Sequence, residues 1–233
     1  MRPAGYVKND GGYLTALNAW TPKSIAGLAV WLRADMGVIT GTGGVSEWID
    51  QSGNWNSAAQ TNSAWRPDLN ASDSNLNSQP SLTFGASQAM DLALNETSSD
   101  WTVFSVAYVS STSGTRSIMD DGASAMRYRA VSGNMTSWDG ASQVSQTMAV
   151  GAHAICARHG ASAGMVRVGA SSTAGTLAAV AISNPKLGAR NANSTADNWL
   201  SEIAEHIVYQ SALSDTDVQA VMDYLGARYS VTV

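Results

Sequence analysis

Short apolar segments separated by small polar residues are the feature that most constrains the fold of this chain. Residues 126–131 and 134–138 are examples, with turn-forming residues at 132–134 and 138–140. Residues 101–109 carry apolar side chains at both alternating sets of positions, which is expected of a central strand covered on both faces. Further strands are expected at residues 28–32, 153–157, 165–168 and 200–209. This spacing predicts an all-β fold, a two-sheet antiparallel sandwich, rather than alternating strands and helices.

The sequence predicts one α-helix, near the C-terminal end of the chain. Ser214 has the chemistry of an N-cap, and Asp217 three residues later forms a variant of the capping box. Leu213 and Val218 can pack together as a hydrophobic staple. Apolar residues then recur at helical spacing, at Val218, Val221, Met222 and Leu225. The apolar stripe should dock this helix on the body of the protein.

The first residues differ from the rest, because they show no sustained periodicity. We expect residues 1–22 to form an extended N-terminal arm and residues 23–233 to form one β-sandwich domain. Tyr6, Tyr13 and Trp20 are the expected anchors of the arm on a neighbouring molecule. The alternative is a disordered tail.

Charge is unusually scarce in this chain of 233 residues. Charged residues make up 13%, against about 25% in an ordinary soluble domain, and the net charge is −5. Without a basic patch, nucleic-acid binding is not expected. No apolar run approaches the roughly 18 residues of a membrane span, and the first residues lack the apolar core of a signal peptide. The single cysteine, Cys156, excludes an internal disulfide framework.

Carboxylate pairs suited to glycoside hydrolysis are missing from the sequence. The chain has four glutamates, and Glu202 and Glu205 lie three apart on an expected strand, so their side chains point to opposite faces. Glu205 is therefore expected to be structural. Residues 160–164 match the pattern G-x-S-x-G, but strand-like residues follow them, so a small-residue hairpin turn is expected instead of a nucleophile elbow. These observations predict that the protein is not an enzyme.

Metal binding is an open question in two loops. Asp50 in one loop, and Asp120 and Asp121 in another, place hard oxygen atoms beside glycine turns, which suits calcium. Aspartate also occupies turns for local conformational reasons. No other cofactor is expected, because the three histidines show no zinc-ligand spacing.

Three tryptophans surround the first of these loops. Trp48, Trp55 and Trp65 lie on either side of Asp50 and Asn54. Aromatic rings stack on the C–H faces of sugars, while amides and carboxylates bind their hydroxyls. The five residues therefore form a candidate sugar platform, the alternative being that the tryptophans belong to the core.

Several stretches together resemble the laminin-G-like branch of the concanavalin-A-like lectin/glucanase superfamily. The similar stretches are residues 25–35, 48–54, 79–85, 202–209, 212–215, 221–225 and 228–229. The resemblance implies a jelly roll of two antiparallel sheets with the terminal helix on one side. It also implies a choice of functions, because the family includes glucanases, sugar-binding modules, adhesion domains and phage virion proteins. The catalytic carboxylates of the glucanase members are absent.

The leading functional prediction is a non-enzymatic phage virion protein, either a capsid decoration protein or a tail-associated protein. It would be assembled in the host cytoplasm and located on the virion surface. Residues 1–22 would hold a homo-oligomer on the capsid shell or on neighbouring copies. The alternative is a carbohydrate-binding module that recognises surface glycans, and a third candidate is a divergent glycoside hydrolase.

Overall fold

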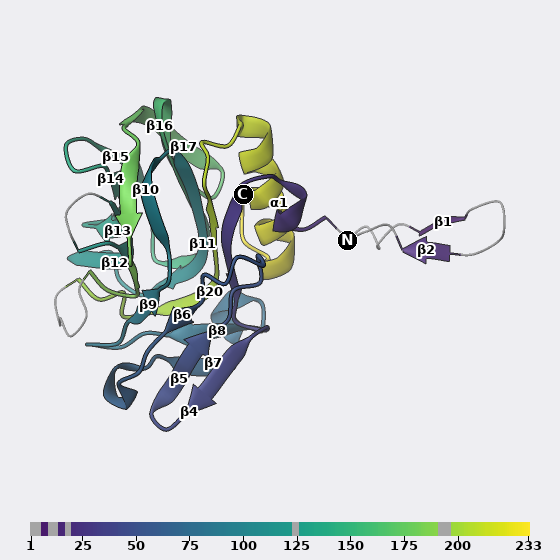
Figure 1. Cartoon of the computed structure of the whole chain (residues 1–233), viewed down its shortest axis with the longest axis vertical. Helices are drawn as coiled ribbons and strands as arrows, with labels where there is room; N and C mark the ends of the chain where they lie inside the picture. The colour runs from purple at the N-terminus through teal and green to yellow at the C-terminus, as the bar shows by residue number, and fades with distance from the viewer. Residues whose placement is uncertain (1–5, 9–13, 17–19, 123–125, 191–196) are drawn as a thin grey trace.

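The computed structural model is a β-sandwich made of a seven-stranded and a nine-stranded sheet, with one α-helix packed beside it (Figure 1). The strand pairings that the structure describes in both sheets are antiparallel. The predicted all-β sandwich with a C-terminal helix is therefore confirmed. The structure describes residues 6–8, 14–16, 20–122, 126–190 and 197–233.

The seven-stranded sheet contains the longest strands. Its order is β17 (Ser171–Leu177), β16 (Gly151–Val168), β11 (Trp101–Val109), β20 (Glu202–Tyr209), β8 (Gln79–Thr83) and β7 (Asp68–Asp73), and β3 (Leu28–Arg33) also pairs with β20. The chain therefore brings its first long strand, β3, against its last, β20.

The nine-stranded sheet is built from shorter strands. Its order is β15 (Gln143–Thr147), β14 (Asn134–Trp138), β13 (Arg127–Val131), β12 (Thr115–Asp120), β19 (Lys186–Leu187), β9 (Met90–Leu92), β6 (Ala58–Ala59), β5 (Gly44–Trp48) and β4 (Val38–Gly41). Two further strand pairs are β1 (Tyr6–Lys8) with β2 (Leu14–Ala16) and β10 (Asn95–Ser99) with β18 (Val180–Ser183). Short 3₁₀ turns occur at Pro22–Ser24, Ser63–Trp65 and Ser74–Leu76.

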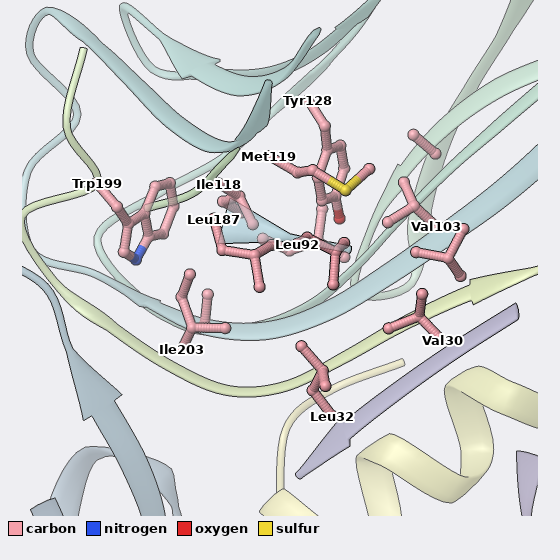
Figure 2. Packing of buried hydrophobic residues seen from close by; sticks show 14 of the residues in the cluster. Val30, Leu32, Leu92, Val103, Ile118, Met119, Tyr128, Leu187, Trp199 and Ile203 are labelled. Carbon is pink, nitrogen blue, oxygen red and sulfur yellow. The ribbon is translucent and has the colours of Figure 1, made fainter. Parts of the chain in front are cut away.

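Strand β11 has apolar contacts on both of its faces, as its sequence predicts. Val103 belongs to the core between the two sheets, whereas Phe104 and Val106 pack in the second core, under the helix. Figure 2 shows the core between the sheets, where Val103 and Val30 lie on the opposite side from Tyr128. Because strand side chains alternate, one strand contributes to both cores.

Helix α1 (Asp215–Tyr229) begins where the capping signals place it. The Ser214 hydroxyl accepts a 3.1 Å hydrogen bond from the backbone N–H of Asp217. The predicted stripe of Val218, Val221, Met222 and Leu225 is buried against the outer face of the seven-stranded sheet. Within the described part of the chain, no helix combines the length and the apolar character needed to cross a membrane.

Strand β16 differs from its prediction, because it runs through residues 160–164 without a turn. Its pairing with β17 instead shifts register between Gly160 and Gly164. A Cβ on Gly160 would lie 2.9 Å from the Ala212 Cβ, and one on Gly164 would contact the Gly175 backbone. These glycines therefore permit close approach of other chain segments. In the sequence, glycines with this role look the same as glycines in a turn.

The predicted arm contains a short strand pair, since Tyr6 of β1 lies opposite Ala16 of β2. Tyr13 lies outside the described residues. Trp20 is described, and it precedes the 3₁₀ turn that leads into β3. The boundary at residue 22 and the assembly role of the arm stay predictions.

Candidate functional site

A groove with a volume of about 770 Å³ lies beside α1. Three parts of the chain form it: the segment before β3, the connection from the third 3₁₀ turn into β8, and one side of the helix. Its lining residues are Trp20, Asn77, Gln79, Ala220, Asp223, Tyr224, Ala227 and Arg228. The five helical residues recur every three or four positions, so they share one face of α1.

Two aromatic side chains form one wall of the groove. The Trp20 and Tyr224 ring centroids lie 5.7 Å apart with a 50° angle between the ring planes. Trp20 is 36% exposed. The amide groups of Asn77 and Gln79 and the carboxylate of Asp223, which are planar and polar, also line the groove. A flat ring flanked by amide and carboxylate groups suits a ligand with both apolar faces and hydroxyls.

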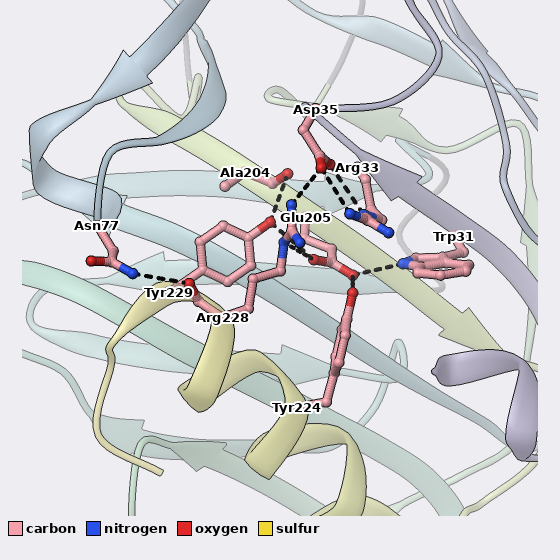
Figure 3. A network of polar contacts seen from close by, with 9 residues as sticks. All are labelled: Trp31, Arg33, Asp35, Asn77, Ala204, Glu205, Tyr224, Arg228 and Tyr229. Carbon is pink, nitrogen blue, oxygen red and sulfur yellow. Dashed lines mark hydrogen bonds and ion pairs between the residues drawn. The ribbon is translucent and has the colours of Figure 1, made fainter. Parts of the chain in front are cut away.

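The groove wall is held from behind by the carboxylate of Glu205, which is fully buried in the middle of β20 (Figure 3). Its Oε1 atom accepts hydrogen bonds from Trp31 Nε1 at 2.6 Å and from the Tyr224 hydroxyl at 3.0 Å. Its Oε2 atom accepts one from the Tyr229 hydroxyl at 2.9 Å. Glu205 therefore joins the sheet to the helix and fixes the orientation of Tyr224. It has the structural role expected from the sequence, but its partners are side chains from β3 and α1.

Arg228 extends this network to the protein surface. One of its terminal nitrogens lies 2.6 Å from Asp35 Oδ2, and its Nε lies 3.7 Å from Glu205 Oε2. Asp35 also pairs with Arg33 at 2.7 Å. The Asn77 amide donates a hydrogen bond to the backbone carbonyl of Arg228. The guanidinium that lines the groove is thus already neutralised by two carboxylates.

Burial determines the protonation of the network. Burial raises the pKa of Glu205, while the hydrogen bonds from Trp31 and the tyrosines oppose that rise. Burial and the Glu205 carboxylate together raise the pKa of the Tyr224 hydroxyl. Tyr224 consequently remains a neutral hydroxyl whose proton points to Glu205, and its ring is the part that faces the groove.

The loop predicted to bind sugar or calcium uses its polar groups internally. Asp50 Oδ1 accepts from the backbone N–H groups of Trp31 and Ser52, both at 2.8 Å. Asp50 Oδ2 accepts from the Ser52 hydroxyl at 2.6 Å and from the N–H of Asn56 at 3.1 Å. The Asn54 amide donates to the Leu28 carbonyl at 2.7 Å. These side chains fix the loop against β3, and their bonding capacity is largely used there.

The three predicted platform tryptophans do not form one surface. Trp48 is fully buried in the core between the sheets, so no ligand can stack on it in the folded protein. Trp65 is half-buried at the end of a 3₁₀ turn. Trp55 is 86% exposed and has a left-handed backbone conformation, with φ of 64°. Trp55 alone presents its ring openly to solvent.

The predicted calcium ligands do not gather either. Across the described ranges, no group of three or more His, Cys, Asp or Glu side chains could hold a metal ion. Asp120 is fully buried, accepts a hydrogen bond from the N–H of Gly122, and lies 4.0 Å from Arg127. Burial raises the pKa of its carboxyl to about 6. Asp121 follows it in the turn after β12.

Sequence reasoning named Trp20 and Glu205 for other roles and missed Asn77, Gln79 and Asp223. Asn77 itself has a left-handed backbone conformation, Gln79 is the first residue of β8, and neither belongs to a motif. The helical spacing of Asp223 and Tyr224 was available, but it identifies a helix face without showing what lies opposite. Only the folded chain brings Trp20 to that face.

The sequence matches no protein-family model and no curated protein. The structure does resemble solved structures. Trypanosoma rangeli sialidase in complex with sialic acid matches with a TM-score of 0.57 and 12% identity, over 87% of this chain and 33% of the sialidase chain. The binding domain of Paraclostridial Mosquitocidal Protein 1 matches with a TM-score of 0.60 and 12% identity, over 87% of this chain and 52% of that one.

An arabinofuranosidase complexed with arabinofuranosyl-α-1,2-xylobiose gives a third match, with a TM-score of 0.58 and 11% identity, over 81% of this chain and 52% of that one. The chain thus spans about a third of the sialidase and about half of the other two. At these identities the likeness shows the fold alone. That fold, a β-sandwich, agrees with the two antiparallel sheets that the resemblance in the sequence implies.

These matches correct the prediction that the protein is not an enzyme, because its fold recurs in sialidases and an arabinofuranosidase. The prediction depended on the absence of carboxylates two apart on one strand. In the folded protein, Asp91 of β9 and Asp120 of β12 are both opposite Lys186 of β19, so these two carboxylates lie on one face of the sheet, two strands apart. A motif within one strand is therefore not required for two carboxylates to share a sheet face.

Proposed function

We propose that this protein recognises carbohydrate and that the sugar binds in the groove between Trp20 and α1. The observation that carries the proposal is the Trp20–Tyr224 wall, which lies beside the amides of Asn77 and Gln79 in an open groove. The volume of about 770 Å³ is within the range of roughly 300–1,000 Å³ typical of small-molecule sites.

The charges around the groove favour a neutral sugar. Arg228 is paired with Asp35 and lies near Glu205, so its charge is compensated within the protein. Asp223 contributes a carboxylate that accepts a hydrogen bond from Gln219. A carboxylate accepts hydrogen bonds from sugar hydroxyls but repels an anionic group. The structural matches support a sugar ligand, since two of them were solved with a saccharide bound.

Tryptophan substitutions test the proposal, because the chain offers a matched control. A glycan array identifies a neutral oligosaccharide ligand, and calorimetry then measures its affinity. We expect Trp20→Ala to weaken binding about tenfold or more, equivalent to about 1.4 kcal/mol. Trp55→Ala removes another exposed tryptophan, which does not line the groove, and should leave the affinity unchanged. Loss of binding in Trp55→Ala with full binding in Trp20→Ala would instead place the site on the Asp50 loop.

Glycoside hydrolysis is a second candidate, favoured by the matches to sialidases and an arabinofuranosidase. Asp223 is the carboxyl group that lines the groove, and Glu205 lies behind Tyr224. If the protein is a hydrolase that works in this groove, Asp223→Asn should no longer form the hydrolysis products but should still bind the ligand. Incubation of the protein with the array-positive oligosaccharide, followed by chromatography of the products, distinguishes hydrolysis from binding.

A laminin-G-like domain of phage type, located on a virion surface, is the more specific proposal made from the sequence. The matched structures do not support it. Residues 1–22 would then attach a homo-oligomer to the capsid shell or to neighbouring copies. Deleting these residues should leave a folded domain that no longer assembles. Unchanged assembly of the truncated protein would count against this role.

A further inference from the structure

A second depression adjoins the groove on the surface of α1, and it has a volume of about 500 Å³. Its lining residues are Asp215, Thr216, Gln219, Ala220 and Asp223. Ala220 and Asp223 also line the groove beside Trp20. The two spaces therefore share a border, and the groove continues toward the N-terminal end of the helix.

The helical residues that line the two spaces form two parallel rows along α1. The rows are Asp215, Gln219, Asp223 and Ala227, and beside them Thr216, Ala220, Tyr224 and Arg228. Residues four apart are neighbours on one face of a helix, so each row runs along the helix. At a rise of about 1.5 Å per residue, the rows extend over about 20 Å. A lined surface of this length accommodates several linked sugar rings.

Two arginines of β16 hold the polar side chains of the first row in place. Arg158 pairs with Asp215 Oδ1 at 2.6 Å, and Arg167 donates a 2.8 Å hydrogen bond to Gln219 Oε1. The Gln219 amide in turn donates a 2.7 Å hydrogen bond to Asp223 Oδ1. The sheet therefore fixes three successive polar side chains along the depression, which lowers the entropy cost of binding a ligand there.

The side chains of the depression keep bonding capacity that solvent can reach. The Oδ2 atoms of Asp215 and Asp223 accept no hydrogen bond from the residues that the structure describes. The Asp215 side chain is 87% exposed, and Thr216 and Asp223 are exposed as well. A carboxylate oxygen accepts hydrogen bonds from hydroxyls, and a glutamine amide has a second N–H group to donate. The depression therefore offers the groups that bind the hydroxyls of a sugar ring.

We propose that the ligand is a linear, neutral oligosaccharide that binds along α1, with one ring stacked on Trp20 and further rings in the second depression. This inference rests on the proposed function and adds the length and the shape of the ligand. The aromatic wall supplies the stacking surface, and the row of fixed polar side chains supplies the partners of the hydroxyls. A β-1,4-linked chain is extended, so it can follow the helix from one space into the other.

The test is calorimetry on the full chain with the β-1,4-linked dimers and hexamers of glucose, xylose and mannose. At least one hexamer should bind more than tenfold more tightly than its dimer, which exceeds the statistical advantage of the five overlapping dimer units in a hexamer. Gln219→Ala should weaken hexamer binding at least fivefold and dimer binding less than twofold. Gln143→Ala removes an exposed glutamine of β15 that lines neither space, and it should change neither affinity. Melting temperatures establish that each variant is folded.

The outcomes separate this inference from the proposed function. Equal affinities for dimer and hexamer, both lost in Trp20→Ala, would overturn the extension along α1 and leave the groove as the sugar site. Wild-type hexamer affinity in a folded Gln219→Ala would overturn the role of the second depression. Unchanged hexamer affinity in Trp20→Ala would overturn the proposed function, and the absence of binding by all six oligosaccharides would overturn both.

Discussion

Trp31 Nε1 donates a 2.6 Å hydrogen bond to Glu205 Oε1 across a sequence separation of 174 residues. Trp31 belongs to β3 and Glu205 to β20, and these strands pair directly in the seven-stranded sheet. Tyr224 shares the same carboxylate oxygen from the helix. One buried carboxylate thus joins the first long strand, the last strand and α1, and it positions the groove wall.

Glu205→Gln should destabilise the protein by about 2–4 kcal/mol. The substitution removes the charge and replaces one acceptor oxygen by a donor amide, which leaves buried hydroxyl or indole donors without acceptors. Urea unfolding measures the loss. Tyr224→Phe deletes a single hydrogen bond of the same network and should cost about 1 kcal/mol. A Glu205→Gln protein as stable as wild type would show that the network contributes specificity but little stability.

Trp48→Ala and Trp55→Ala should differ sharply in stability. Trp48 is fully buried, so its truncation leaves a cavity and should cost about 3–5 kcal/mol. Trp55 is 86% exposed, and its truncation should change the free energy of unfolding by less than about 0.5 kcal/mol. Chemical denaturation of both variants under the same conditions provides the comparison. Similar losses in both variants would mean that the Trp55 ring is packed against the protein in solution.

His159 should make the protein sensitive to acid. Burial lowers the pKa of His159 to about 4, from 6.5, and its ring stacks on Trp101 at 3.7 Å. The unfolded chain binds a proton on this residue more readily than the fold does. The free energy of unfolding therefore falls as the pH falls from about 6.5 to about 4, by up to roughly 3 kcal/mol.

The variant His159→Gln isolates this contribution, because other groups also titrate in this range. Burial raises the pKa of Asp120 to about 6, which changes stability in the opposite direction, and Asp120 is present in both proteins. Urea unfolding at several pH values between 7.5 and 4.5 should show a shallower loss in His159→Gln. Parallel curves for the two proteins would contradict the assignment.

Gly188→Ala and Gly53→Ala should separate a steric cost from a conformational one. Both glycines have positive φ, 81° for Gly188 and 102° for Gly53. A Cβ on Gly188 would overlap the ring of Phe84, whereas a Cβ on Gly53 would meet nothing within 4 Å. Gly53→Ala should cost about 1–2 kcal/mol, the strain of the left-handed conformation alone. Gly188→Ala should cost distinctly more, and equal melting temperatures for the two variants would contradict this.

Local patterns in the sequence were sufficient to predict the fold class. The alternating residues 101–109, the cap at Ser214 and the stripe from Val218 to Leu225 each specify an element from neighbours a few residues apart. Where close approach between distant segments decides the structure, local sequence patterns predict the wrong element. Gly160 and Gly164 resemble turn residues, but they lie within a continuous strand because other chain segments pack against them.

The sequence by itself determined a β-sandwich with a capped terminal helix, because strand and helix periodicities and capping are local properties. The tertiary structure decided which side chains form sites. It buried Trp48, left Trp55 exposed, and brought Trp20 to Tyr224. These relationships depend on strand register and on packing between segments far apart in the chain. No pattern along a single segment encodes them, because each requires the positions of two segments at once.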